Sequence, residues 1–213
     1  EGTGGFTEFF KGRVVMPYTG SFAEFKKVLR HELIHVFTLE KINAVMKEHK
    51  KTRAPYSPLW FTEGIAEAWS RPEDDQARMV MTDLVVNNIL VSVPDLYRIS
   101  GSFMMYKEGE SFIRFLSETY GSDRLLQLFE NWWRGETFEE LVQLVYQKDL
   151  KKLGEEWEFS LKQRFYPQVA QREFPDRKAK KLSSGGLSVE PTPVTLSEGN
   201  DRGPTEGGRN ELI

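Results

Sequence analysis

Apolar residues recur at helical spacing over the segment 22–37. The segment opens with the sequence S-F-A-E at residues 21–24, a capping box in which serine caps the first turn and glutamate reaches back to it. No glycine or proline follows until Pro55, so we expect one long helix that begins near Phe22 and frays in the basic run 47–51. The apolar positions that follow this spacing are Phe22, Phe25, Leu29, Leu33, Val36 and Phe37.

A short β region is expected before this helix, and a series of shorter helices after it. Residues Phe6–Met16 have the composition of a strand, with Gly12 as a turn or bulge. A serine cap and a first-turn proline at residues 57–58 open a helix with the sequence LWFTEGIAEAWS, which stops before Pro72. Further helical patterns, with Gly121 and Gly135 as stops, cover residues 76–91, 103–119, 123–134, 138–147 and 151–165.

The composition of the chain changes after Pro167. Residues 183–213 are rich in Ser, Gly, Pro, Thr and Glu and contain few large apolar side chains, so this segment cannot bury enough surface to order itself. We therefore predict a helix-dominated α+β domain over residues 1–167 and a linker or disordered tail over 168–213.

Overall composition narrows the possible functions. With 213 residues, of which 39% are hydrophobic, the chain is long enough for one well-packed domain with appendages. A net charge of −3 without a basic stripe argues against nucleic-acid binding, and the absence of cysteine excludes disulfides and cysteine-ligated zinc. No apolar run reaches the length of a membrane span. The sequence begins at Glu1 rather than Met, so we expect a processed or excised piece whose targeting segment is missing.

Two of the three histidines lie four residues apart in the long predicted helix, in the sequence H-E-L-I-H at residues 31–35. Residues i and i+4 share one face of a helix, so His31 and His35 can bind a single Zn²⁺. Glu32 between them can act as general base toward a metal-activated water. The alternative is a pair of helix histidines beside an exposed glutamate, with no metal.

A zinc hydrolase usually needs a third protein ligand. The metzincin signature requires a glycine and a histidine at positions held here by Thr38 and Lys41, so that class is excluded. The remaining candidates are Glu63 and Glu67, spaced i,i+4 on the following helix. One can bind zinc while the other accepts the free ring N–H of a ligand histidine. The small residue Gly64 would allow close packing against the histidine helix. The alternative is two solvated glutamates on an amphipathic helix.

The pair HELIH and WFTEGIAEAW resembles the motifs of the gluzincin metallopeptidases, the clan of thermolysin and the aminopeptidase-N-like enzymes. It is most similar to bacterial peptidase-MA-like domains, whose second motif has the form W-x-x-E-G-x-A-E. The resemblance covers residues 5–167 and implies a zincin-like domain: a short N-terminal β region, an active-site helix pair and a helical subdomain. It also implies that Glu63 is the third zinc ligand and that Glu67 supports a zinc-binding histidine.

Two further features bear on this resemblance. The sequence Y-K-E-G at residues 106–109 resembles the Y-x-x-G helix start of aminopeptidase-N-like enzymes, which implies that the Tyr106 hydroxyl stabilises the oxyanion. The alternative for Tyr106 is an ordinary core tyrosine. The chain departs from those enzymes in having 27 residues (36–62) between His35 and Glu63, and in lacking the G-x-M-E-N motif that grips a substrate amino terminus.

The resulting prediction is a peptidase with one Zn²⁺, held by His31, His35 and Glu63, that cleaves a peptide or protein substrate with Glu32 as general base. The resemblance implies that the strand Gly12–Met16 forms the cleft edge, where an extended peptide can pair. The alternative function is an inactive, zinc-stabilised interaction module of a larger envelope protein. In peptidase-MA-like bacterial proteins such a domain can precede a C-terminal β-propeller. The resemblance also favours a location in the bacterial cell envelope or periplasm, or secretion. The presence of Glu32 favours the enzyme, because a structural zinc site needs no base.

Overall fold

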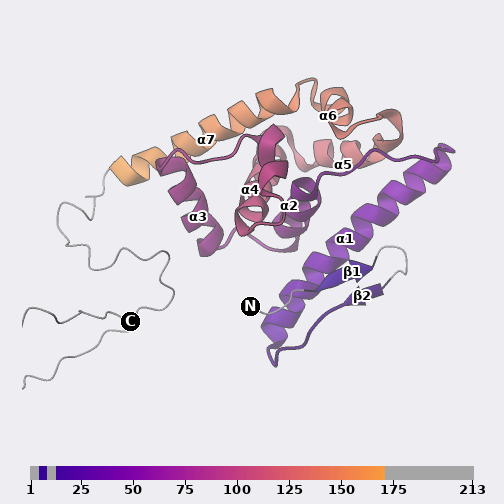
Figure 1. Ribbon diagram of the computed structural model, residues 1–213, viewed down its shortest axis with the longest axis horizontal. Helices are drawn as coiled ribbons and strands as arrows, with labels where there is room; N and C mark the ends of the chain where they lie inside the picture. Colours follow the sequence, from indigo (N-terminus) through magenta and orange to yellow (C-terminus); the bar gives the residue numbers. More distant parts are fainter. Residues whose placement is uncertain (1–4, 9–12, 171–213) are drawn as a thin grey trace, which may run out of the picture. The chain divides into compact units, whose positions relative to one another are not determined.

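The computed structural model describes residues 5–8 and 13–170 (Figure 1). The chain divides into two units, Glu1–Gln168 and Val169–Ile213. Helices dominate the first unit, and its one sheet among the described residues has two strands. This confirms the prediction of a mostly helical α+β domain. The predicted tail lies outside the described residues from 171 onward, and the division at 167/168 stays a prediction.

A small β-hairpin precedes the long helix. Strands β1 (Phe6–Glu8) and β2 (Arg13–Val15) pair antiparallel, with Phe6 opposite Val15. The region predicted as strand over Phe6–Met16 therefore contains two short strands. The predicted turn or bulge at Gly12 falls outside the described residues.

The long helix α1 (Phe22–Glu48) begins where the capping box predicts, because the Ser21 hydroxyl accepts a hydrogen bond from the backbone N–H of Glu24 (3.3 Å). It ends inside the basic run. Lys50 adopts a left-handed conformation (φ 52°), and the backbone N–H of Lys51 donates to the carbonyl of Met46 (2.9 Å). These bonds satisfy carbonyl groups that the last turn would otherwise leave unpaired.

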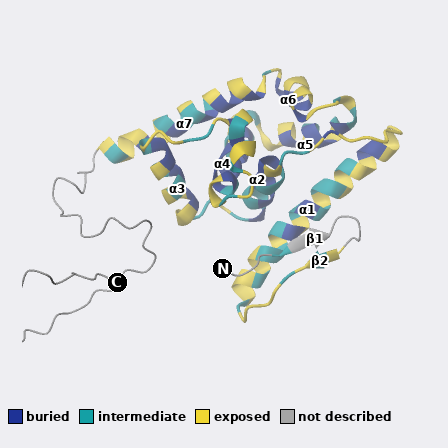
Figure 2. Ribbon diagram, viewed as in Figure 1, coloured by how far each residue is buried: buried dark blue, intermediate teal, exposed yellow. Residues whose placement is uncertain are grey.

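The packed face of α1 differs from the apolar stripe of its sequence. Phe22 and Phe37 are exposed, at 79% and 63% of their surface, whereas His35 and Met46 are buried. Figure 2 shows the same alternation of exposed and half-buried positions along the helix. Helical spacing identified the helix correctly, but it did not identify the face that packs.

Helices α2 (Leu59–Ser70) and α4 (Phe103–Tyr120) pack against each other in the middle of the unit, between α1 and α7 (Leu150–Ala170) (Figure 1). They meet backbone to backbone at two glycines. A Cβ on Gly64 would lie 2.7 Å from the carbonyl carbon of Gly109, and a Cβ on Gly109 would lie 2.5 Å from the carbonyl oxygen of Trp60. Gly64 thus allows close contact with α4, not with the histidine helix as the sequence suggested.

The remaining helices surround this pair. Helix α3 ends well before residue 91, because Asn88 turns left-handed (φ 54°) and the N–H of Ile89 closes on the carbonyl of Leu84 (2.9 Å). A 3₁₀ helix that the sequence did not predict then follows. The segment predicted as one helix over 123–134 is broken at Asn131, whose side-chain amide donates to the carbonyl of Gln127 (2.8 Å). The observed elements are α3 (Asp75–Val86), η2 (Val93–Ile99), α5 (Ser122–Glu130), η3 (Trp132–Arg134), α6 (Phe138–Tyr146) and α7 (Leu150–Ala170).

Large aromatic side chains fill the core. Trp132 and Trp157 are buried, and their indole N–H groups donate to the carbonyl of Pro55 (3.2 Å) and to the hydroxyl of Ser111 (3.1 Å). These two tryptophans therefore pack helices together. In the part of the chain that the structure describes, no helix has the length and apolar character needed to cross a membrane.

Candidate metal site

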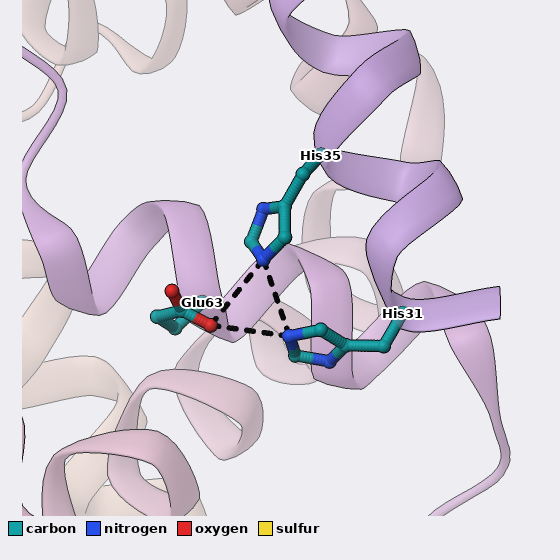
Figure 3. A group of neighbouring side chains, drawn as sticks. All are labelled: His31, His35 and Glu63. Carbon is teal, nitrogen blue, oxygen red and sulfur yellow. Dashed lines mark hydrogen bonds and ion pairs between the residues drawn. The ribbon is translucent and has the colours of Figure 1, made fainter. Parts of the chain in front are cut away.

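Helices α1 and α2 bring two histidines and a glutamate to one point (Figure 3). The Nε2 atoms of His31 and His35 lie 3.2 Å apart. Oε2 of Glu63 lies 3.2 Å from Nε2 of His31 and 3.4 Å from Nε2 of His35. His35 is buried, while His31 and Glu63 are half-buried.

These three donor atoms have the spacing that a tetrahedral zinc ion requires. Zinc binds nitrogen and oxygen at about 2.0–2.2 Å, which separates the ligand atoms of a tetrahedron by about 3.3 Å. The observed separations of 3.2–3.4 Å agree with this value. Two imidazole nitrogens and one carboxylate oxygen are also the donor set of many zinc hydrolases. His31, His35 and Glu63 could therefore hold a metal ion such as zinc.

The pKa values of His31 and Glu63 are strongly shifted by their contacts with each other and with neighbouring groups. Burial lowers the pKa of His31, but its hydrogen bonds to Glu63 and Glu67 outweigh this effect and raise the pKa to about 9. For Glu63 the directions are reversed: burial raises the pKa, but the hydrogen bonds to His31 and His35 outweigh burial and lower the pKa to about 2. Without a metal, these interactions therefore favour a protonated His31 beside an ionised Glu63 at neutral pH.

Glu67, one turn after Glu63, contacts the other side of the His31 ring. Its Oε1 lies 3.2 Å from Nδ1 of His31. Its Oε2 accepts hydrogen bonds from the guanidinium of Arg71 and from the ammonium of Lys107 (3.1 Å). The sequence left open which glutamate faces which ring nitrogen. In the structure Glu63 lies at the Nε2 atoms and Glu67 at Nδ1.

The remaining two predicted residues lie close by. Glu32 is buried (4% exposed), and a Cβ on Gly5, just before β1, would come within 3.0 Å of its Oε1. Tyr106 lies in the first turn of α4 and is half-buried. Burial raises the pKa of the Tyr106 hydroxyl, and the charges of Glu63, Glu67 and Glu32 add to the rise. The charges of these three carboxylates therefore act on the Tyr106 hydroxyl.

Sequence reasoning missed the charged residues behind Glu67. Lys107 and Glu110 are almost completely buried on α4, at 3% and 1% exposed. They occur in the sequence Y-K-E-G-E, where three charged residues precede a strongly apolar helical run. Charged residues are seldom buried unless they are paired. Charged residues at the start of an otherwise apolar helix are therefore the signal that could have identified Lys107 and Glu110 as paired residues.

The fold and this cluster together define a class of protein. A mostly helical α+β domain with an H-E-x-x-H helix, and a second helix that adds a glutamate to the two histidines, is a gluzincin-like peptidase domain. The model of the Peptidase MA superfamily matches residues 15–163, and the chain belongs to that superfamily. The curated proteins and the solved structures yielded no significant match. Membership confirms the family seen in the motifs; the bacterial origin stays a prediction.

Proposed function

We propose that this domain is a zinc-dependent peptidase with His31, His35 and Glu63 as metal ligands. The observation that carries the proposal is the tetrahedral spacing of the three donor atoms on two adjacent helices. Family membership supports peptidase chemistry in general. The donor set supports zinc in particular, because imidazole and carboxylate ligands at these separations suit it.

The residues around the metal ligands have distinct roles in this proposal. When bound, zinc would lower the pKa of a water molecule in its open position and polarise the scissile carbonyl. Glu32 accepts the proton of the attacking water and returns it to the leaving amine. Glu67 accepts a hydrogen bond from Nδ1 of His31, which keeps Nε2 available as a ligand. The Tyr106 hydroxyl donates to the oxyanion as it develops.

The substrate in this proposal is an extended peptide or protein. The β-hairpin before α1 offers strand edges, and the chain just before it lies against Glu32. Backbone pairing with such an edge holds a peptide along its length and needs no free amino terminus. An N-terminally acetylated peptide should therefore be cleaved about as well as the free peptide. Cleavage of single N-terminal residues, with acetylated peptides untouched, would indicate an aminopeptidase instead.

The test combines metal analysis with a peptide library read by mass spectrometry. The wild type should bind about one zinc per chain and cleave the library. Glu32→Gln should keep the zinc and the fold but lose nearly all cleavage, whereas Glu63→Gln should lose zinc. Glu40 is an exposed glutamate on α1, the helix that carries Glu32. Glu40→Gln is therefore the matched control for Glu32→Gln and should behave as the wild type.

Three outcomes would contradict the proposal or part of it. A protein that does not bind zinc even after metal addition has no metal site of this kind. A protein that binds zinc but leaves every peptide intact matches the alternative, a zinc-stabilised interaction module. Full activity in Glu32→Gln would show that the assigned general base is wrong.

A further inference from the structure

A chain of buried ion pairs extends from the candidate metal site into the contact between α2 and α4. Glu67 shares its carboxylate between His31, through Oε1, and Lys107, through Oε2. The Lys107 ammonium also donates to Oε2 of Glu110 at 3.2 Å. Lys107 therefore bridges two carboxylates, one on α2 and one on its own helix.

The far end of this chain returns to α2. The Arg114 guanidinium donates to Oε1 of Glu110 (2.9 Å) and to the backbone carbonyl of Arg71 (2.6 Å). Arg71, just after the end of α2, pairs with Glu67 and with Asp74 (3.1 Å). The contacts close into a loop that includes both helices.

Lys107 differs from Arg71 in what it connects. Arg71 lies four residues after Glu67 on the same segment, and its guanidinium is shared with Asp74. Lys107 is 40 positions away from Glu67 and only 3% exposed. An ammonium buried to this extent needs charged partners on several sides, and a carboxylate paired with it is held in one orientation. Lys107 thus ties the carboxylate of Glu67 to α4, the helix that also carries Tyr106.

We propose that Lys107 is a positioning residue of the metal site: it holds Oε2 of Glu67, so that Oε1 stays directed at Nδ1 of His31. This inference rests on the proposed zinc site. Lys107 touches neither the ligand atoms nor the reacting groups, and it acts through Glu67 alone. Loss of the group that orients a metal ligand, here Glu67, typically weakens metal affinity about 10–100-fold, so loss of Lys107, which acts through Glu67, should cost about 10-fold or less.

The test must separate positioning from charge balance, because removing Lys107 alone takes away one of the two positive charges that pair with Glu110, the other being Arg114. The double variant Lys107→Met/Glu110→Gln removes one positive and one negative charge and nearly conserves volume. The matched control is Glu110→Gln, which keeps the contact between Lys107 and Glu67. Zinc dissociation constants are measured by competition with a chromophoric chelator, and metal-free melting temperatures are measured on the same samples.

The double variant should bind zinc more weakly than Glu110→Gln, by up to about 10-fold, at a similar melting temperature, because Arg71 still pairs with Glu67. Equal affinities in the two variants would overturn the role of Lys107 while the zinc site itself stands. A wild type that binds no zinc would instead refute the proposed function. If the double variant does not fold, Lys107→Gln, which retains a donor without charge, is compared with the wild type, and an unchanged affinity again overturns the inference.

Discussion

Glu108 offers a test of burial energetics in this domain that does not depend on the metal. Its side chain is fully buried on α4. Oε2 accepts a hydrogen bond from the backbone N–H of Val91 (3.0 Å), and Oε1 has no hydrogen-bond partner among the described residues. Burial raises the pKa of this carboxyl from 4.5 to about 7, and the bond from Val91 offsets only part of the rise.

The direction of the pH effect follows from this shift. The folded state binds the Glu108 proton more tightly than the unfolded state does, so the contribution to stability is complete below pH 4.5 and is lost as the pH rises through 7. At roughly 1.4 kcal/mol per pKa unit, the full loss is about 3 kcal/mol, and about 2–3 kcal/mol of it falls between pH 5 and 8.

Glu108→Gln should remove this dependence. The amide oxygen of glutamine can accept the same N–H of Val91, and the amide does not ionise. Relative to wild type, the variant should therefore gain about 2–3 kcal/mol of unfolding free energy between pH 5 and pH 8. The measurement is urea unfolding followed by circular dichroism, with a chelator present so that metal binding does not contribute.

The comparison between variant and wild type cancels the other titrating groups, His31 included, because both proteins contain them. Glu118→Gln, on the exposed side of the same helix, is the control, and its profile should run parallel to that of the wild type. If the Glu108→Gln profile also runs parallel to the wild type from pH 5 to 8, the carboxyl does not titrate in this range and the reasoning from burial is refuted.

Three further predictions concern the site and its support. Because the pKa of His31 is about 9 without metal, zinc binding at pH 6.5 should release about one proton, and the apparent affinity for zinc should rise about 10-fold per pH unit below pH 9. Calorimetry in two buffers of different ionisation enthalpy tests this release. Identical binding heats in the two buffers would contradict it. Tyr106→Phe should lower kcat about 10²–10³-fold with little change in KM, whereas a change in melting temperature alone would make Tyr106 a core residue. Gly109→Ala should lower the free energy of unfolding in urea by about 1–3 kcal/mol or more, since the new Cβ would lie 2.5 Å from the carbonyl oxygen of Trp60. Gly154→Ala is the comparison and should lower it by less, because its Cβ would meet a side-chain methyl at 3.1 Å. Equal losses would argue against a rigid contact between α2 and α4.

Local patterns predicted the parts of the site that lie within one or two helical turns. The spacing of His31 and His35 defines a shared face wherever the helix packs, and the capping box placed the start of that helix correctly. The roles proposed for Glu63 and Glu67 rest on their spacing together with the family motif, and the structure places Glu63 beside His31 and His35. Their assignment to particular ring nitrogens required the actual crossing of α1 and α2.

Features that depend on which helices cross were not predictable from the same patterns. Lys107 and Glu67 are far apart in sequence, and nothing local indicates that they meet. The small size of Gly64 indicated a close contact, but the partner is α4 and not α1. The exposed Phe22 and Phe37 make the same point, since helical spacing reports a face without reporting what covers it.

The contact between Gly64 and Gly109 also bears on how this domain can change by mutation. Gly64 directly follows Glu63, and Gly109 lies one turn beyond Tyr106, so main-chain atoms in contact set the separation between the backbones of the proposed metal ligand and the proposed oxyanion donor. A change of side-chain rotamer does not alter this backbone separation. Evolution or an engineer can therefore vary the exposed surface around the site and alter selectivity while this separation stays the same. A larger side chain at either glycine would change both groups at once.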